Sequence, residues 1–211
     1  MDLGLKGKTA IITGATKGIG RAAAAALAAE GARIAICASS DEIHRTAESL
    51  RKTHGTDVLS HQVDLRHADE IEAFVLASQH ELGGAEIVIA NSGGPPPGAF
   101  LSLSPQDWQD AFQLTVMSSV HLCYAALPFM LEAGGGSIVM CQSYSVKQPV
   151  DNLVLSNALR MSVIGLAKSL ANELGPQGVR VNSINPAWTA TDRVTELMND
   201  RAQRAGTTPQ A

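Results

Sequence analysis

The stretch Thr13-Gly14-Ala15-Thr16-Lys17-Gly18-Ile19-Gly20 connects an Ile-rich apolar run, Thr9–Thr13, to an alanine-rich segment, Arg21–Ala29. The apolar run predicts a buried strand, and the alanines predict a helix that packs closely on a sheet. Glycines between them let the backbone turn tightly and bring helix-terminal amides close to a pyrophosphate. The stretch therefore predicts a phosphate-binding strand-to-helix turn; a plain tight turn is the alternative.

The glycine spacing separates two kinds of phosphate loop. Gly14, Gly18 and Gly20 follow the pattern Gly-x-x-x-Gly-x-Gly, and no Gly-Lys-Ser/Thr ending is present. A nucleoside-triphosphate P-loop requires that ending. The loop is therefore a poor match to a P-loop.

The alternation of apolar runs with helical periodicity continues along the chain. Strands are expected at 9–13, 33–38, 57–63, 85–90, 137–141 and 180–184, and helices at 20–30, 42–54, 68–82, 105–133 and 152–174. This order predicts an α/β fold, a three-layer doubly wound parallel sheet of the Rossmann type. Since no internal repeat or Gly/Ser linker interrupts it, residues 1–211 are expected to form a single domain.

A proline-rich segment, Gly93-Gly94-Pro95-Pro96-Pro97-Gly98, follows the fourth expected strand. Three prolines remove three backbone donors and fix φ, so the segment is neither helix nor central strand. We expect a stiff loop at the edge of the sheet where ligands bind in open parallel sheets. A rigid surface turn without a ligand is the alternative.

Composition excludes several classes of partner. The 20 acids exceed the 16 Lys and Arg residues, giving a net charge of −4, whereas nucleic-acid binding needs clustered positive charge. The N-terminus lacks the apolar region of a signal peptide, and no apolar stretch of about 18 residues predicts a membrane span. We therefore expect a cytoplasmic protein without a nucleic-acid or membrane partner.

Cysteine and histidine spacing predicts no metal site. The three cysteines, Cys37, Cys123 and Cys141, form no Cys-x-x-Cys pair, and the six histidines show no ligand spacing. A disulfide framework is equally disfavoured by their number and spacing. The cysteines are expected to be small buried hydrophobic residues.

Six ordered landmarks between about Leu5 and Asp192 resemble the short-chain dehydrogenase/reductase family, which includes 3-oxoacyl-acyl-carrier-protein reductases. They are Thr13–Gly20, Val63–Leu65, Asn91–Gly93, Ile138-Val139 leading to Ser143, Val163–Leu166 and Val181–Pro186. The resemblance implies an enzyme that interconverts a small-molecule carbonyl and the matching alcohol with a nicotinamide coenzyme.

The resemblance also implies a coenzyme site. The glycine loop would hold the pyrophosphate, and Asp64 with the backbone of Leu65 would bind the adenine. The segment Asn91–Gly93 would lie against the ribose. The segment Pro186–Thr191 would surround the nicotinamide end. The implied coenzyme-binding residues are Gly14, Thr16, Lys17, Gly18, Ile19, Gly20, Ser39, Ser40, Asp64, Leu65, Asn91, Ser92, Gly93, Arg160, Pro186, Thr189 and Thr191.

Charge at the end of the second strand favours NADP over NAD. An NAD enzyme of this fold usually places an acid there to hold the ribose 2′-hydroxyl, and that acid would repel a 2′-phosphate. Here Ala38 stands at that position, followed by Ser39 and Ser40, and Lys17 lies in the glycine loop. Asp41 is close enough in sequence to leave NAD as an alternative.

The catalytic pattern departs from the family's Asn, Ser and Tyr-x-x-x-Lys. Ser143 is in register, but Thr115 stands at the Asn position, Ser156 at the Tyr position and Arg160 at the Lys position. A tyrosine has a pKa near 10, which a nearby cation lowers, whereas a serine hydroxyl is too weak an acid to exchange a proton unaided. Arginine keeps the charge but does not relay a proton.

Two functions remain open at this stage. In the first, an NADP-dependent oxidoreductase, Ser143 orients the substrate, Arg160 anchors the ribose, and Tyr144, tuned by Arg160 or Lys147, donates the proton. In the second, the protein is a catalytically inactive NADP-binding sensor or assembly subunit. Tyr144 is then an aromatic side chain that lines the expected substrate cleft, and Lys147 is a solvated charge.

Family members continue beyond the sixth strand through a lid and a seventh strand, whereas this sequence ends at Ala211. We expect the lid and last strand to be absent, either natively or because the sequence is truncated. The uncovered edge of the sixth strand then favours a partner, and the family's pairing through its long helices predicts a homodimer or homotetramer.

Overall fold

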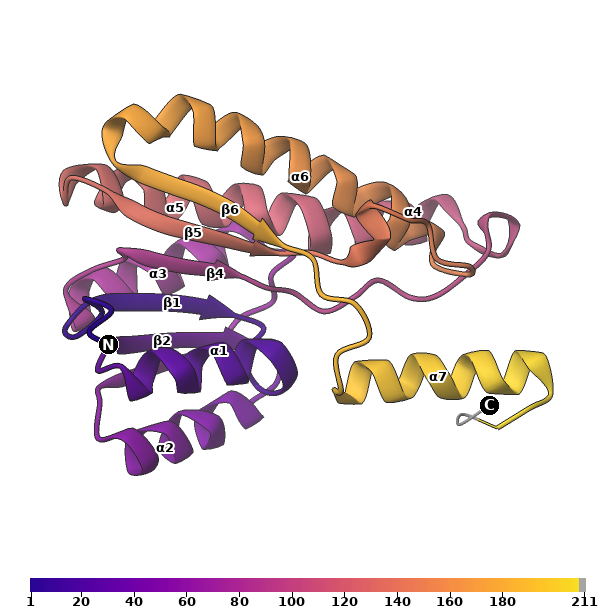
Figure 1. The fold of residues 1–211 in the computed structure, drawn as a ribbon, viewed down its shortest axis with the longest axis horizontal. Coiled ribbons are helices and arrows are strands. Elements are labelled where there is room, and N and C mark those ends of the chain that lie inside the picture. The colour runs from indigo at the N-terminus through magenta and orange to yellow at the C-terminus, as the bar shows by residue number, and fades with distance from the viewer. Residues whose placement is uncertain (209–211) are drawn as a thin grey trace.

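The structure is a computed structural model that describes residues 1–208. Its strands form one six-stranded parallel sheet in the order β3-β2-β1-β4-β5-β6 (Figure 1). The strands are β1 (Thr9–Thr13), β2 (Arg33–Ala38), β3 (Val58–Gln62), β4 (Ile87–Ala90), β5 (Gly136–Cys141) and β6 (Val179–Ile184). The chain winds outward in both directions from the middle of the sheet, which confirms the predicted doubly wound Rossmann fold.

Helices cover both faces of the sheet (Figure 1). One face packs on α1 and α2, and the other packs on α3, α5 and α6. The helices are α1 (Gly18–Ala29), α2 (Glu42–His54), α3 (Ala68–Leu82), α4 (Pro105–Phe112), α5 (Ser118–Glu132), α6 (Val154–Leu174) and α7 (Asp192–Ala205). Gly20, Ala24 and Ala28 are the buried residues of α1, and their four-residue spacing places small side chains on the face toward the sheet.

The helix predicted over 105–133 is not continuous. It begins as expected, with a Ser104–Asp107 capping box and a proline at the first turn. The π-helical turn η2 (Gln113–Met117) then separates α4 from α5. Hydrophobic periodicity does not reveal a π turn, which is an expanded turn within a helix and is frequent at functional sites.

By length and composition the same segment, Pro105–Glu132, would be apolar enough to cross a membrane, which corrects the expectation that no stretch has this character. Within the fold, however, α5 packs against α3 and contributes Leu122, Ala126 and Met130 to the buried core. The apolar character of this segment is therefore explained by its place in the core.

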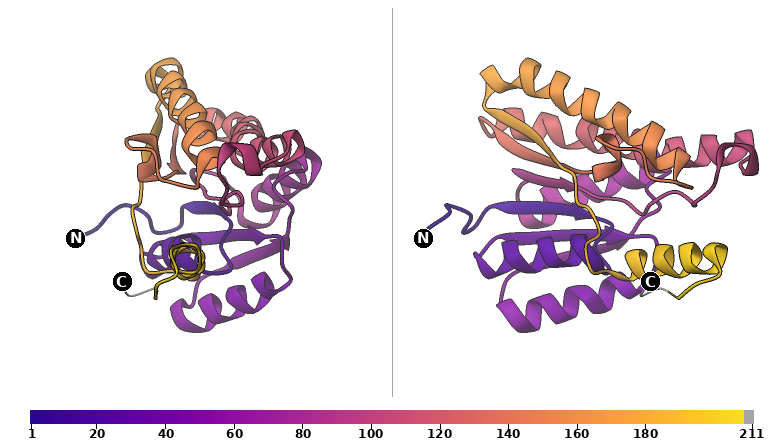
Figure 2. Two further views of the ribbon diagram at one scale, coloured as in Figure 1. Left: turned by 90° about the vertical axis from the view of Figure 1, so that its right-hand side faces the viewer. Right: turned by 45° about the vertical axis from the view of Figure 1, so that its right-hand side comes forward.

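The segment after β6 forms a helix that the sequence reading did not predict. Figure 1 and Figure 2 show α7 beyond the carboxyl ends of the strands, near the N-terminal end of α1. The remaining boundaries differ slightly from expectation: β4 begins at Ile87, and α6 at Val154. As predicted, β6 lies at the edge of the sheet.

Candidate functional site

The glycine loop, Thr13–Gly20, is held in place by Asn91 at the end of β4. The Asn91 side-chain amide donates to the carbonyl oxygens of Thr13 at 3.2 Å and Gly14 at 3.0 Å. Gly14 has a φ of 59°, and a Cβ there would lie 2.8 Å from Asn91 Nδ2. A Cβ on Gly20 would lie 2.4 Å from the Gly14 carbonyl oxygen. The close approach of these segments therefore requires glycine at both positions.

The N-terminus of α1 carries no side-chain cap. Its N-cap residue, Lys17, has extended backbone and makes no capping hydrogen bond, and the first turn contains no acid. The first amides of a helix lack intrahelical partners and favour an anion. The residues brought together here therefore fit the pyrophosphate of a dinucleotide. They are the predicted Gly14, Thr16, Lys17, Gly18, Ile19 and Gly20.

Asn91 has a role that the resemblance did not imply. Both of its side-chain donor bonds go to the glycine loop, so the amide positions the loop itself. Ser92 Oγ donates to the carbonyl oxygen of the next residue, Gly93, at 3.2 Å. The segment Asn91–Gly93 thus lies beside the glycine loop, where the ribose was expected.

Asp64 at the predicted adenine end is bound by Arg66. Arg66 Nε donates to Asp64 Oδ1 at 3.0 Å, and a second guanidinium nitrogen contacts Oδ2. These bonds, with the Arg66 backbone amide, lower the pKa of Asp64 to about 2. Glu70 Oε2 accepts a hydrogen bond from the Asp64 amide at 2.7 Å, and Leu65 is buried. Asp64 is therefore a fixed, ionised carboxylate.

No carboxylate is part of the end of β2 itself. Ser39 is exposed and its carbonyl oxygen accepts from Gln62 Nε2 at 2.9 Å, while Ser40 is half-buried. The neighbouring acid, Asp41, is the N-cap residue of α2 and makes no capping bond. The two serine hydroxyls therefore stand at the position where the sequence predicts the 2′-group of the coenzyme.

Ser156 and Arg160 lie in direct contact on α6. Arg160 is only 7% exposed, and its Nε donates to Ser156 Oγ at 3.1 Å. Its Nη1 contacts Gln142 Oε1 at 3.3 Å and the Cys141 carbonyl oxygen at 3.5 Å. Burial lowers the pKa of the guanidinium, and no carboxylate of residues 1–208 lies within salt-bridge distance of it. Arg160 is thus a buried cation held by neutral acceptors.

Gln142 is a site residue that the sequence reading missed. It is buried at the end of β5, immediately before Ser143, and its side chain accepts from Arg160. The available signal was its position, since a polar residue at the carboxyl end of a central strand faces the ligand side of the sheet.

Ser143 and Tyr144 follow β5 directly. Ser143 Oγ accepts from the Ser145 amide at 3.2 Å and begins the short 3-10 turn η3 (Tyr144–Val146). The Tyr144 amide donates to the Pro186 carbonyl oxygen at 3.0 Å, and its ring lies 6.0 Å from the ring of Trp188. The segment after β6 is therefore attached to the segment after β5.

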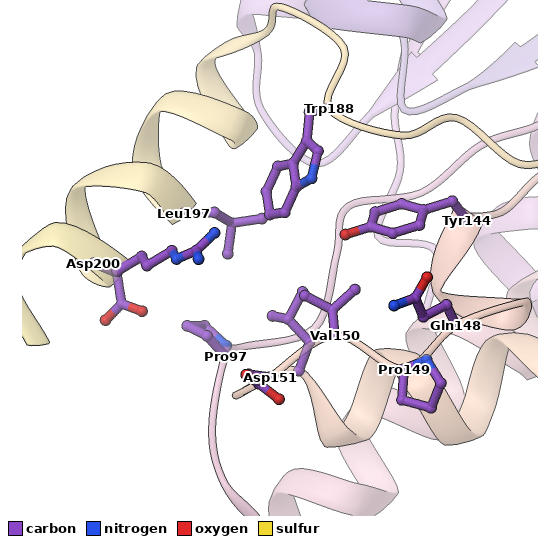
Figure 3. A pocket seen from close by; sticks show the side chains of 11 residues that line it. Pro97, Tyr144, Gln148, Pro149, Val150, Asp151, Trp188, Leu197 and Asp200 are labelled. Atoms are coloured by element: carbon purple, nitrogen blue, oxygen red, sulfur yellow. The ribbon is translucent and has the colours of Figure 1, made fainter. Parts of the chain in front are cut away.

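A cleft of about 700 Å³ opens beside Tyr144. Its walls come from the proline-rich segment 93–98 (the proline loop), the segment 144–153 and α7. The Tyr144 hydroxyl points into it (Figure 3). The lining residues are Pro97, Tyr144, Gln148, Pro149, Val150, Asp151, Leu153, Trp188, Leu197, Asp200 and Arg201. The Gly98 amide donates to the Asn152 carbonyl oxygen at 2.7 Å, which joins the proline-rich segment 93–98 to the segment 144–153.

Two further residues were singled out in the sequence, Thr115 at the family's Asn position and Lys147 near Tyr144. Thr115 lies in the π turn, and its buried hydroxyl has no hydrogen-bond partner among residues 1–208. Lys147 is exposed, and its side chain makes no hydrogen bond or ion pair within the same range. The geometry therefore gives no contact through which Lys147 would act on Tyr144.

The segment Pro186–Thr191 runs along the open side of the site. Thr191 Oγ1 donates to the Thr189 carbonyl oxygen at 3.3 Å, and Thr191 is the N-cap residue of α7. A Cβ on Gly18 would lie 3.4 Å from Thr191 Cγ2, so this segment passes over the glycine loop.

The cysteines lie in β2, α5 and β5 and are all buried, as predicted. Burial raises the pKa of the Cys37 and Cys141 thiols and raises that of Cys123 to about 12. Within the described part of the chain, no group of three or more His, Cys, Asp or Glu side chains could hold a metal ion.

Comparison with known proteins gives the same family. A family model described as short chain dehydrogenase matches residues 8–202. The chain is 33% identical over 202 residues to D-beta-hydroxybutyrate dehydrogenase of Cupriavidus necator, covering 96% of this chain and 78% of that protein. It is 36% identical over 194 residues to D-threitol dehydrogenase of Mycolicibacterium smegmatis, and this match covers 90% of this chain and 74% of that protein.

A solved structure extends this likeness to the fold. L-Sorbose reductase from Gluconobacter frateurii, complexed with NADPH and L-sorbose, superposes with a TM-score of 0.92 at 32% identity, covering 98% of this chain and 79% of that one. With a family match over most of its length and relatives above 30% identity across nine-tenths of it, this chain belongs to the short-chain dehydrogenase family.

Proposed function

We propose that the protein is an NADP-linked oxidoreductase that reduces a small-molecule carbonyl or oxidises the matching alcohol. The observation that carries the proposal is the uncapped N-terminus of α1 beside a glycine loop that Asn91 holds open. Such an arrangement is suited to a dinucleotide pyrophosphate. When bound, the coenzyme supplies or accepts the hydride.

The preference for NADP rests on charge. Ser39 and Ser40 provide hydroxyl groups at the end of β2, and Lys17 provides a cation in the glycine loop. A 2′-phosphate is favoured by that cation and meets no carboxylate from these two residues. Asp64, ionised and fixed by Arg66, would accept a hydrogen bond from the adenine amino group.

In the proposed enzyme the residues around β5 and α6 handle the substrate. Ser143 would orient the carbonyl, and Arg160, which is held by Ser156 and Gln142, would bond the nicotinamide ribose. Tyr144 would donate the proton, because its hydroxyl reaches the cleft and phenols as a class are far stronger acids than aliphatic alcohols. Water entering the open cleft is the competing proton source.

The substrate proposed is a ketone, an oxoacyl compound or the corresponding alcohol. The relatives are named for hydroxybutyrate, threitol and sorbose, all of which are small molecules that carry hydroxyl groups. The cleft combines the apolar Leu153 and Leu197 with the polar Gln148 and Asp151 at its wall. This mixture suits a small substrate of the same general kind.

A second candidate function is a catalytically inactive NADP-binding protein that acts as a sensor or assembly subunit. The specific observation in its favour is the hydrogen bond between Ser156 and Arg160, the two residues that the resemblance puts at the family's Tyr and Lys positions. An enzyme needs a proton donor elsewhere, whereas a binding protein does not.

One experiment separates the two candidates. Coenzyme binding is measured by fluorescence titration with NADPH and NADH, and turnover by the loss of NADPH absorbance with a panel of ketoses, simple ketones and 3-oxoacyl thioesters. We expect tighter binding of NADPH and turnover of at least one ketone. Binding without any turnover selects the inactive protein, and equal affinity for both coenzymes contradicts the NADP assignment.

The Tyr144→Phe variant tests the proton donor. If the phenol donates the proton, the expected loss in turnover is on the order of 10²-fold or more, typical of general acid catalysis, with coenzyme affinity unchanged. Lys147→Ala is the matched control and is expected to leave turnover intact, because the exposed Lys147 side chain makes no hydrogen bond or ion pair among residues 1–208. Unchanged turnover in Tyr144→Phe would exclude the phenol.

We further propose that residues 1–211 act as one dinucleotide-binding domain in the cytoplasm and that the chain forms a homodimer or homotetramer. Tyr124 on α5 and Met161 on α6 are 76% and 50% exposed, which leaves apolar surface on the two long helices. Size-exclusion chromatography with light scattering measures the assembly.

A further inference from the structure

The first turn of α7 contacts both loops that border the coenzyme and substrate regions. Asp192 Oδ2 lies 3.2 Å from Lys17 Nζ in the glycine loop. The next residue, Arg193, donates from Nη2 to the Pro95 carbonyl oxygen in the proline loop at 2.8 Å. Figure 1 and Figure 2 show α7 near the N-terminal end of α1, in agreement with these contacts.

The two residues before Lys17 contact β2 and α2. The carbonyl oxygen of the preceding residue, Thr16, accepts from Thr46 Oγ1 of α2 at 3.2 Å. The Ala15 amide donates to the Cys37 carbonyl oxygen of β2 at 3.1 Å. In a Rossmann fold the end of the second strand holds the 2′-group of the coenzyme ribose. The backbone of Lys17 therefore lies beside the region where a 2′-phosphate would bind, and its side chain reaches Asp192 on α7.

Asp192 places a carboxylate against this lysine. Among residues 1–208, the ion pair with Asp192 is the only one that Lys17 makes. The two side chains are 63% and 70% exposed, so the pair is screened by water and weak enough for a phosphate to compete for the ammonium group. The carboxylate thus engages the cation that an anionic coenzyme needs.

We propose that Asp192 is a coenzyme-specificity residue that weakens the preference for NADP by competing for Lys17. NADPH carries one phosphate more than NADH, at the ribose position next to Lys17. Its affinity therefore depends more strongly on whether the ammonium group is available. This inference rests on the proposed function, because it requires that the glycine loop binds a nicotinamide dinucleotide.

The test is the Asp192→Asn variant, with the dissociation constants of NADPH and NADH measured by fluorescence titration at low salt. We expect the affinity for NADPH to rise about 2- to 5-fold, the range of an exposed ion pair, and the affinity for NADH to rise less. High salt should reduce the difference, because exposed charges are screened. Glu196→Gln is the control, since Glu196 is on the same helix but pairs with Arg193 at 3.6 Å.

A Lys17→Ala background isolates the contact. There we expect Asp192→Asn to leave the NADPH-to-NADH affinity ratio unchanged, since the lysine for which it competes is gone. An effect of equal size in that background, or an equal rise for both coenzymes in the parent protein, would overturn the assignment to Asp192. If the wild-type protein binds neither coenzyme, the proposed function fails first; binding of both with no effect of Asp192→Asn overturns this inference alone.

Discussion

Replacing Arg160 with methionine should leave the fold about as stable as before while impairing coenzyme binding and turnover. The guanidinium is 7% exposed and has no carboxylate partner within residues 1–208. Burying an ion costs several kcal/mol after relaxation of the protein. Hydrogen bonds to a charged group return about 1.5–3 kcal/mol each, and Arg160 makes three, one of them long. The two contributions are of similar size.

Methionine removes both contributions and fills much of the same volume with an unbranched apolar side chain. The acceptors left behind, chiefly Gln142 Oε1 and the Cys141 carbonyl oxygen, cost about 1–3 kcal/mol each if they stay buried and unpaired. The net change in the free energy of unfolding is therefore expected to lie within about 2 kcal/mol of zero.

Urea denaturation followed by circular dichroism measures the stability, and NADPH titration measures the function. Arg160→Ala is the matched control, because it removes the same charge but leaves a cavity, and it should be less stable than Arg160→Met by about 2 kcal/mol. A loss above about 3 kcal/mol in Arg160→Met would refute the reasoning, since that is the cost of breaking a structural buried ion pair. Wild-type NADPH affinity in the same variant would refute the functional role.

Three further predictions follow from the site. Gly20→Ala should abolish NADPH binding in a titration and lower stability by about 1–3 kcal/mol, because its methyl group would lie 2.4 Å from the Gly14 carbonyl oxygen; retention of both would contradict the packing argument. The pKa of Asp64 is lowered from 3.8 to about 2, first by the Arg66 side chain, so its stabilising contribution is present above pH 3.8 and is lost as pH falls through about 2. The Asp64→Asn variant should therefore lose less stability than the wild type as the pH is lowered. Identical acid denaturation curves for the variant and the wild type would contradict a stabilising contribution from the Asp64 carboxylate. The three cysteines, whose pKa values are raised by burial, should resist alkylation near neutral pH until urea exposes them; rapid native labelling detected by mass spectrometry would contradict their burial.

The glycine loop could be predicted from the sequence because its constraints are local. A glycine at 14, 18 and 20 between an apolar run and an alanine-rich helix leaves few other conformations. The sheet and most of the helices could be predicted for the same reason, since those strands and helices carry their own periodicity. Even so, the link from the Asn91 side chain to the Gly14 carbonyl oxygen needed the structure, because these residues meet only after β1 and β4 pair.

The substrate half could be predicted only in outline. The π turn around Thr115 adds no signal to the hydrophobic pattern of the helices that flank it. The sequence analysis did not predict α7, whose first turn contacts distant loops through Asp192 and Arg193. Gln142 acquires its role from an arginine on another element. These are tertiary interactions, which local sequence patterns do not encode.

The contacts that join Arg160 to Ser156 and Gln142 are better understood as one arrangement than as separate features. The resemblance implies a tyrosine at the position of Ser156, where the smaller serine hydroxyl accepts a hydrogen bond from Arg160 Nε at 3.1 Å. Gln142 adds a second side-chain acceptor at the end of β5. Losing the tyrosine alone would leave a cavity, and gaining the arginine alone would bury a cation without acceptors, each at a cost of several kcal/mol. We expect this buried cation to add little net stability, so the two side chains arranged around it are better explained by what it binds than by what it holds together.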